Sequence, residues 1–222
     1  MRSTILNGTI NCSWDSVIPF DEMWLRLNKL IKPNGAIVLF GSEPFSSALR
    51  MSNIKNYKYD WVWVKSLKTG FHSSNYRPLK KHENISLFST GGVSFISNKR
   101  CLYNPLGLIE SGKTNKRGRD GTGYRGVSIN KYKQNFTNYP SSILNFNSEN
   151  GHHPTQKPVA LMEYLIRTYT NENEIVLDFT MGSGSTLVAC KNTNRKGIGI
   201  ELDEGYFKIT KQRLINTGKP LF

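Results

Sequence analysis

Apolar residues recur along the first part of the chain in two patterns, one typical of amphipathic helices and one typical of buried strands. Residues 21–32 carry apolar side chains three and four positions apart, which predicts a helix with an apolar face of Met23, Trp24, Leu27, Leu30 and Ile31. A Pro-Asn-Gly turn at residues 33–35 ends this helix, and the apolar run at residues 36–40 predicts a fully buried strand. Two more strands are predicted at residues 59–64 and 84–89.

The same alternation of helices and strands returns after residue 150. Pro158 suits the first position of a helix, whose apolar face would consist of Val159, Met162, Leu165, Ile166 and Tyr169. A strand, a helix, a strand and a helix are then predicted at residues 174–179, 185–192, 197–201 and 203–215. This order predicts an α/β fold with a mainly parallel sheet and helices on both faces.

Length and composition narrow the class of protein. The chain has 222 residues, enough for one hydrophobic core with a small appended lobe. It has no apolar run of about 18 residues and no secretory signal, so neither a membrane span nor export is predicted. The three cysteines at positions 12, 101 and 190 form neither a disulfide framework nor a metal-binding knuckle. We therefore expect a cytoplasmic, reduced protein without a metal site.

The net charge of +14 is concentrated in two segments. Residues 65–81 contain five basic and no acidic side chains, and residues 99–133 contain nine basic and two acidic ones. Because these segments carry twelve of the fourteen excess charges, we expect double-stranded DNA rather than a membrane surface as partner. The second segment also has many glycines and interleaved tyrosines. The segment is either a solvated, disordered loop or a DNA-facing insertion. Both descriptions apply if the loop becomes ordered only when it binds DNA.

Two glycine motifs match phosphate-binding patterns but lack the surrounding elements. Residues 107–114 match the phosphate-loop pattern GxxxxGK[ST], and residues 121–126 match GxGxxG. A phosphate loop must follow a buried strand and open a helix, so that its backbone amides converge on the phosphates. Neither segment has that context, so we interpret both as loops. Nucleotide binding at Lys113 is the weaker alternative.

A third glycine motif, at residues 178–186, has the context that the other two lack. It reads Asp-Phe-Thr-Met-Gly-Ser-Gly-Ser-Thr, follows a predicted strand directly and opens a predicted helix. Gly182 and Gly184 allow a tight turn and close approach to a ligand. The next predicted strand ends in Glu201, 23 residues after Asp178, where an acid is placed to bind ribose hydroxyls. The pattern predicts a nucleoside-containing cofactor, and not a triphosphate, because no lysine follows the last glycine.

These residues resemble those of the amino-methylating DNA methyltransferases that use S-adenosylmethionine. The resemblance implies a cofactor motif that consists of Asp178, Phe179, Gly182, Ser183 and Gly184, with Glu201 as the ribose-binding acid. Residues 153–158, His-Pro-Thr-Gln-Lys-Pro, resemble the element that precedes the cofactor strand in this family. The resemblance places His153 and Lys157 at the methionine end of the cofactor, where a helix beginning near Pro158 offers free amides to a carboxylate.

The order of the elements resembles the beta group of this family, in which the catalytic half precedes the cofactor half. The group implies a Rossmann-like methyltransferase fold in permuted order, as one domain over residues 1–222 with a target-recognition insertion at residues 90–150. The implied function is site-specific adenine N6-methylation of DNA, as in restriction-modification, in a bacterial or phage-infected cell. The side chains expected to contact DNA are Lys113, Lys116, Arg117, Arg119 and Arg125.

The N-terminal region departs from the family pattern. Members carry an Asp-Pro-Pro-Tyr or Asp-Leu-Pro-Tyr tetrapeptide that polarises the target amine and stacks on the flipped base. The aligned position here holds Thr4, Ile5, Leu6 and Asn7, which offer no carboxylate, proline or aromatic ring. No catalytic residue is therefore identified, and we expect little or no methylation by the chain as written. The alternatives are a catalytically silent DNA-binding remnant or one piece of a split methyltransferase, with a missing N-terminal piece or a second copy as partner.

Overall fold

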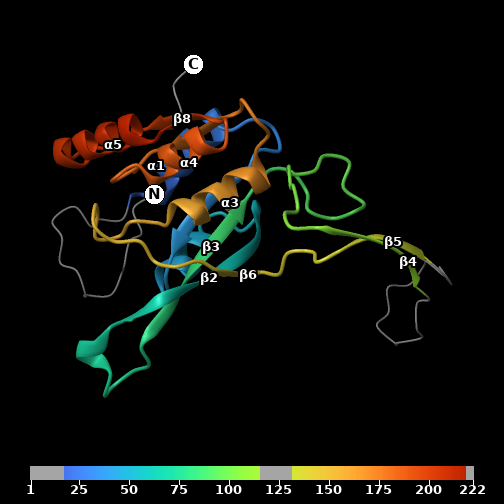
Figure 1. The fold of residues 1–222 in the computed structure, drawn as a ribbon, viewed down its shortest axis with the longest axis horizontal. Coiled ribbons are helices and arrows are strands. Elements are labelled where there is room, and N and C mark those ends of the chain that lie inside the picture. The colour runs from blue at the N-terminus through green and yellow to red at the C-terminus, as the bar shows by residue number, and fades with distance from the viewer. Residues whose placement is uncertain (1–17, 116–131, 219–222) are drawn as a thin grey trace. The chain divides into compact units, whose positions relative to one another are not determined.

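The structure is a computed structural model that describes residues 18–115 and 132–218. The chain falls into two compact units, one made of Met1–Asn104 with Ser142–Phe222 and the other of Pro105–Ser141. We call them unit 1 and unit 2 and describe each by itself (Figure 1). Unit 2 lies inside residues 90–150, and the target-recognition role of that segment stays a prediction.

In unit 1 the chain alternates helices with strands. Its helices are α1 (Phe20–Leu30), α2 (Phe45–Met51), the short 3-10 helix η1 (Phe71–Ser73), α3 (Val159–Tyr169), α4 (Ser185–Asn192) and α5 (Glu204–Asn216). Its strands are β1 (Ile37–Gly41), β2 (Tyr57–Thr69), β3 (Lys80–Phe88), β6 (Ile143–Asn145), β7 (Ile175–Asp178) and β8 (Lys196–Gly199). Every helix and strand predicted from the sequence is present, α4 with the predicted ends and the others with shifted ends, whereas α2, η1 and β6 were not predicted.

The larger sheet of unit 1 has the strand order β1-β3-β2-β6. β3 lies antiparallel to β1 and β2, with Ile85 between Phe40 on one side and Trp61 on the other. β6 lies parallel to β2. The sequence predicted a mainly parallel sheet, and the described strands are mixed because β2 returns into β3 as a hairpin, which requires antiparallel pairing.

Helices cover both faces of this sheet, as the sequence predicted. On one face, α3 packs on β1, β2 and β3 through a cluster of Leu161, Leu165, Tyr169, Phe40, Trp61, Trp63, Ile85 and Leu87. On the other face, α1 and α2 pack on β1 and β3 through Met23, Trp24, Phe45, Leu49, Leu39 and Phe88. The neighbours Leu39 and Phe40 belong to different clusters, because successive strand residues point to opposite faces.

β7 and β8 form a second, parallel sheet in unit 1. Leu177 lies opposite Ile198, and Asp178 lies opposite Gly199. Helix α4 connects the two strands and packs on α3 and β7 through a cluster that includes Ile166, Ala189 and Cys190. A parallel strand pair with a helical crossover is the βαβ unit of Rossmann-like folds, and its first turn carries the ligand-binding glycines.

Unit 2 is built on an antiparallel pair, β4 (Ile109–Asn115) and β5 (Tyr132–Thr137). Residues 107–114, which match the phosphate-loop pattern, run into strand β4 and not into a helix. This placement contradicts the alternative of nucleotide binding at Lys113, because no helix begins there to present amides to phosphates. The second glycine motif, at residues 121–126, lies outside the described residues.

The two segments of unit 1 that flank unit 2 are fixed to α3 and β2 by hydrogen bonds to main-chain carbonyls. The Asn104 N–H donates to the Thr168 carbonyl at 2.8 Å, and the Asn104 side-chain amide donates to the Arg167 carbonyl at 3.1 Å. On the other flank, the Val62 N–H donates to the Ser142 carbonyl at 2.8 Å. One flank is therefore fixed to α3 and the other to β2.

Candidate functional site

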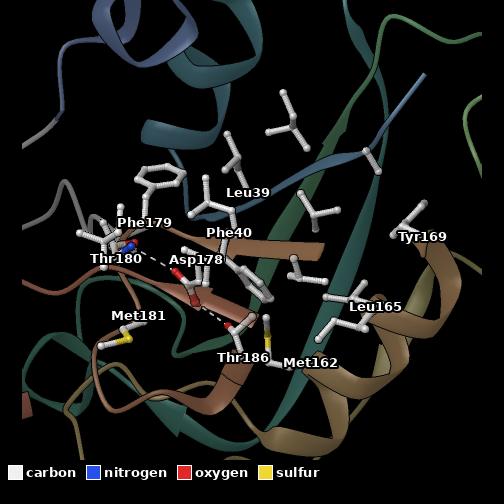
Figure 2. A pocket seen from close by; sticks show the side chains of 18 of the residues that line it. Leu39, Phe40, Met162, Leu165, Tyr169, Asp178, Phe179, Thr180, Met181 and Thr186 are labelled. Atoms are coloured by element: carbon white, nitrogen blue, oxygen red, sulfur yellow. Dashed lines mark hydrogen bonds between the residues drawn. The ribbon is translucent and has the colours of Figure 1, made fainter. Parts of the chain in front are cut away.

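Asp178 lies at the carboxyl end of β7, where the chain leaves the sheet for the third glycine motif. Its Oδ1 accepts a hydrogen bond from the Thr180 N–H at 3.1 Å, and its Oδ2 accepts one from the Thr186 hydroxyl (Figure 2). Thr186 belongs to the first turn of α4. One carboxylate therefore ties the beginning of the turn to the helix that follows it.

Gly182 and Gly184 both have left-handed backbone conformations, with φ of 53° and 78°. At Gly184 a Cβ atom would lie 2.4 Å from Cγ2 of Thr210, so no side chain fits there. Thr210 is buried, and its hydroxyl donates to the Gly182 carbonyl at 3.0 Å. The glycine motif therefore packs directly on α5, in a conformation that favours glycine.

Glu201 follows β8 and accepts hydrogen bonds with both carboxylate oxygens. Its Oε2 accepts from the Gly182 N–H at 2.9 Å, and its Oε1 accepts from the N–H groups of Leu202 and Asp203 at 2.8 and 3.0 Å. The acid at the end of one strand therefore holds the glycine turn at the end of the neighbouring strand. Its contact with ribose hydroxyls stays a prediction.

His153 faces this turn from the segment that precedes α3. A Cβ on Gly182 would lie 3.4 Å from its ring, and its ring centroid lies 4.3 Å from that of Tyr206. Its Nδ1 accepts a hydrogen bond from the Thr155 N–H at 3.1 Å, which leaves the ring proton on Nε2 when the imidazole is neutral. Burial lowers the pKa of His153, although Glu201 acts in the opposite direction. The neutral ring is therefore favoured.

Lys157 is held in a buried ion pair that the sequence did not predict. Its Nζ lies 3.1 Å from Oε2 of Glu83 on β3, and Lys65 on β2 pairs with the other carboxylate oxygen. Burial alone would raise the pKa of Glu83, but the charges of Lys157 and Lys65 outweigh it and lower that pKa to about 2. Burial lowers the pKa of Lys157 against the attraction of Glu83. Lys65, counted above in the basic segment of residues 65–81, is therefore turned inward.

Arg213 on α5 supports the glycine motif and was missed by the sequence analysis. Its Nη1 donates to the Ser183 carbonyl at 2.6 Å, with Ser183 Oγ and Ser185 Oγ at 3.2 and 3.3 Å. Burial lowers its pKa. Tyr206, Thr210 and Arg213 lie four and three residues apart, so one face of α5 contacts the motif. Apolar periodicity does not detect a face made of these residue types.

One cleft of about 1270 Å³ in unit 1 brings these groups together. Seven of the eight predicted cofactor residues line it: Asp178, Phe179, Gly182, Ser183, Glu201, His153 and Lys157. Gly184 lies behind the turn against Thr210. The cleft continues between β1 and β7, where its walls are apolar (Figure 2). A concave site with a polar end and an apolar body is typical of cofactor and small-molecule sites.

Of the residues predicted to contact DNA or to occupy the position of the catalytic tetrapeptide, the structure describes only Lys113. Lys113 lies exposed on β4 of unit 2. Lys116, Arg117, Arg119 and Arg125 lie outside the described residues, as do Thr4, Ile5, Leu6 and Asn7. Within the described part of the chain, no helix is long and apolar enough to cross a membrane.

Comparison with known proteins gives one family throughout. The family described as DNA methylase, N6_N4_Mtase, matches residues 13–212. The chain is 29% identical over 215 residues to Type II methyltransferase M.HpaI of Haemophilus parainfluenzae, covering 92% of this chain and 61% of that protein. It is 30% identical over 210 residues to Type II methyltransferase M2.LlaDCHI of Lactococcus lactis subsp. cremoris, covering 90% and 70%. The chain thus spans less than two thirds of the first relative.

Two solved structures are similar to this chain. The M1.HpyAVI–SAM complex is 29% identical, with a TM-score of 0.57 and coverage of 87% of this chain and 80% of that one. PvuII DNA methyltransferase, described as cytosine-N4-specific, is 17% identical with a TM-score of 0.61, covers 89% and 71%, and shows the fold alone. The Rossmann-like α/β fold predicted from the sequence is confirmed. With a family match over residues 13–212, the chain belongs to the N6/N4 DNA methylase family.

Proposed function

We propose that this chain binds S-adenosylmethionine in the cleft of unit 1 and acts in site-specific amino-methylation of double-stranded DNA, at adenine N6. The observation that carries the proposal is the hydrogen bond between Glu201 and the Gly182 N–H. It joins the acid at the end of β8 to the glycine turn that begins at Asp178. Two acids and a glycine turn at the carboxyl ends of parallel strands suit a ligand with ribose hydroxyls and an amino-acid end.

The residues present fit this cofactor. Left-handed glycines leave space at the turn, and Phe179 and Met181 supply apolar surface for a purine ring. Asp178 and Glu201 supply acceptors for hydroxyl and amino groups, and Lys157 supplies a positive charge for a carboxylate. When bound, S-adenosylmethionine supplies an activated methyl group. The chain's own residues bind and orient it, and the neutral His153 packs edge-on against Tyr206 at the rim of the turn.

DNA binding is proposed for two basic surfaces. One is the segment that includes Lys113 together with Lys116, Arg117, Arg119 and Arg125. The other is the tip of the β2–β3 hairpin, where Lys68, Arg77 and Lys81 are exposed and no acid lies between residues 65 and 81. Phe71 and Tyr76 at this tip are 66% and 90% exposed. Basic side chains suit phosphates, and exposed aromatic rings suit unstacked bases.

A second candidate function is a cofactor-binding, DNA-binding chain without turnover of its own, or one piece of a split methyltransferase. It is favoured by one observation, the absence of a carboxylate, proline or aromatic ring at Thr4, Ile5, Leu6 and Asn7. The two candidates share the cofactor site and the DNA surfaces. They differ in whether methyl groups reach DNA when this chain acts alone.

Calorimetric titration with S-adenosylmethionine tests the shared part of the proposal. We expect Asp178→Asn to weaken binding at least tenfold, because the amide cannot accept hydrogen bonds with both of its terminal atoms. Asp21→Asn, an exposed acid on α1 away from the cleft, is the matched control and should bind like the unaltered chain. The proposal fails if the unaltered chain does not bind the cofactor. Incorporation of a tritiated methyl group into DNA then separates an active enzyme from the second candidate.

A further inference from the structure

Two Asn-Gly dipeptides lie in the part of the chain that the structure describes, at residues 34–35 and 150–151, and a third, at residues 7–8, lies outside it. Asparagine is a thermolabile residue. Its side-chain amide can be attacked by the main-chain nitrogen of the next residue, and glycine hinders this attack least because it has no Cβ. The two described dipeptides differ in their surroundings, so the chain contains an internal comparison of reactivity.

Asn34 and Gly35 are held in the turn between α1 and β1. Asn34 has a left-handed backbone with φ of 63°, and its N–H donates to the Thr90 hydroxyl at 3.3 Å. The Gly35 N–H donates to the Lys32 carbonyl at 2.9 Å. An attack by the Gly35 nitrogen requires that this hydrogen bond break and that the turn rotate. Because α1 and β1 pack in one core cluster, such local opening costs free energy.

Asn150 and Gly151 lie in the segment between β6 and α3, and both are exposed. Gly151 has φ of 122°, a backbone conformation that favours glycine. The dipeptide therefore forms a surface turn at a position where glycine is required. Surface turns of this kind rotate more readily than turns that are tied to core elements.

A ring of hydrogen bonds encloses this second dipeptide. Oε2 of Glu149 accepts from the Gln156 side-chain amide at 3.3 Å, and Oε1 of Gln156 accepts from the His152 N–H at 3.3 Å. Asn150 and Gly151 are the two residues between Glu149 and His152, so their main chain closes the ring. The length of that main chain decides whether both hydrogen bonds can form at once.

The ring is joined to α3 and to the glycine motif. Oε1 of Glu149 accepts from the Val159 N–H at 3.1 Å, at the beginning of α3. The Gln156 N–H donates to the His153 carbonyl at 3.1 Å, and a Cβ on Gly182 would lie 3.4 Å from the His153 ring. A change in the exposed turn is therefore transmitted to the cleft through His153.

We propose that Asn150 is a site of spontaneous deamidation, and that isoaspartate at this position loosens the segment that carries His153. The Gly151 nitrogen attacks Cγ of Asn150 and gives up its proton. The bond from Cγ to the side-chain nitrogen breaks, so ammonia leaves and a succinimide remains. Solvent water then opens the succinimide, at Cγ to give aspartate or at the main-chain carbonyl to give isoaspartate. In sum, the residue loses one nitrogen and one hydrogen and gains one oxygen.

Isoaspartate alters the ring in two ways. Its main chain runs through the former side chain, which inserts one additional carbon atom between Glu149 and His152. It also carries a carboxylate close to that of Glu149, and like charges repel. We expect the Gln156 hydrogen bonds to open and the hydrogen bond from Val159 to Glu149 to weaken. A loss of cofactor affinity should follow, and this last consequence rests on the proposed function.

The test is mass spectrometry of the full chain during storage at physiological pH and temperature. Digestion after glutamate releases residues 150–163, in which Asn150 is the one asparagine, and tryptic digestion releases residues 30–50, in which Asn34 is the one asparagine. We expect Asn150 to react at least tenfold faster than Asn34, with isoaspartate identified by electron-transfer fragmentation. In guanidinium chloride the two should react at similar rates, because the turn is unfolded. Equal rates in the folded chain would overturn the proposal.

Hydrogen exchange measures the effect on the loop. Main-chain amides of residues 151–162 should exchange faster in the fully converted chain than in the fresh chain. Asn150→Gln is the matched control, since its longer side chain closes a less favourable six-membered ring, and the same storage should leave its exchange unaltered. Freshly prepared Asn150→Asp adds the charge without the extra carbon atom and should show a smaller increase. Unaltered exchange after full conversion would refute the loosening.

Calorimetric titration with S-adenosylmethionine separates this inference from the proposed function. The converted chain should bind at least threefold more weakly than the fresh chain, whereas stored Asn150→Gln should bind like the fresh chain. Equal affinity of the fresh and fully converted chains would refute the link to the cleft. If the fresh chain does not bind the cofactor, the proposed function fails, and mass spectrometry and hydrogen exchange still decide the modification and its effect on the loop.

Discussion

Glu201 and Gly182 are joined by a hydrogen bond of 2.9 Å from the glycine N–H to the carboxylate, across nineteen residues of chain. The same carboxylate accepts from the N–H groups of Leu202 and Asp203. The acid therefore shapes the binding turn before it contacts any ligand. A role in holding the turn and a role in binding a ribose are compatible, because Oε2 accepts only the Gly182 N–H among the described residues and can accept a second hydrogen bond.

Replacing Glu201 with Gln should lower both stability and cofactor affinity. The amide retains one acceptor oxygen, and its NH₂ group faces main-chain donors. Because hydrogen bonds to charged groups contribute about 1.5–3 kcal/mol each, we expect a loss of about 2 kcal/mol in the free energy of unfolding. Chemical denaturation measures this loss. Glu204→Gln, at an exposed i,i+4 ion pair on α5, is the control and should change stability by less than about 0.5 kcal/mol.

Gly184→Ala should destabilise unit 1 by about 2–4 kcal/mol, from the left-handed backbone and from the contact of the new Cβ with Thr210. Thr210→Ser removes the methyl group that the Cβ would meet, so the double variant should recover part of the loss. Gly218→Ala meets no neighbouring atom and should be neutral. Thermal unfolding of the unaltered chain, Gly184→Ala, the Gly184→Ala/Thr210→Ser double variant and Gly218→Ala measures these differences. If Gly184→Ala is as stable as the unaltered chain, the geometry of the turn is contradicted.

The Glu83 ion pairs predict a specific acid dependence of stability. The pKa of Glu83 falls from an ordinary 4.5 to about 2 on folding. A lowered carboxyl pKa stabilises the fold above the ordinary value, and this contribution is lost as the pH falls from about 4.5 to about 2. Stability of the unaltered chain should decline through that window, and Glu83→Gln should decline less.

At pH 7 the Glu83→Gln variant should itself be less stable by about 3–5 kcal/mol, because it leaves Lys65 and Lys157 buried without a counter-charge. Glu22→Gln removes an exposed ion pair with Arg26 and should cost less than about 1 kcal/mol. Urea titrations at several pH values measure both variants. Equal losses at Glu83 and Glu22 would show that the buried cluster is not formed.

The hairpin tip predicts a DNA contact separate from unit 2. Arg77→Ala should weaken DNA binding and reduce the slope of log affinity against log salt by about one, as expected for one lost phosphate contact. Tyr76→Ala should weaken binding with little change in slope, because it removes an uncharged ring. Ile54→Ala, an exposed apolar residue outside the tip, is the control. Filter binding over a range of salt concentrations distinguishes the three, and unaltered affinity in both tip variants would exclude the tip from the interface.

The sequence predicted the parts of the fold that depend on local patterns. Apolar periodicity located α1 and α3, and apolar runs located the buried core strands. The glycine motif located both the turn between Asp178 and Gly184 and the helix α4 that it opens. The antiparallel direction of β3 was not predicted, because the pairing of β3 with both β1 and β2 is decided by tertiary packing. α2 was missed because a seven-residue helix carries too few turns for a periodic signal.

The charged core cluster shows why some site residues escape sequence analysis. Glu83 follows a run of basic residues and precedes the strand predicted at residues 84–89, so it was assigned no role, although it shares the strand face of Ile85 and Leu87 at period two. Its burial depends on Lys157, which comes from a segment on the other side of unit 2. Arg213 was not predicted for a similar reason, because its partners are carbonyl and hydroxyl groups of Ser183 and Ser185, in a turn that is remote from it in sequence.

The anchored flanks of unit 2 make residues 105–141 an exchangeable cassette. Asn104 is fixed to α3 and Ser142 to β2, through atoms that belong entirely to unit 1. A change of length or composition between these two anchors leaves the hydrogen bonds of the anchors, the glycine turn and the buried cluster unaltered. On the proposed DNA-binding role of this segment, specificity for a new DNA site would require replacement of one contiguous segment and no change in the cofactor cleft of unit 1.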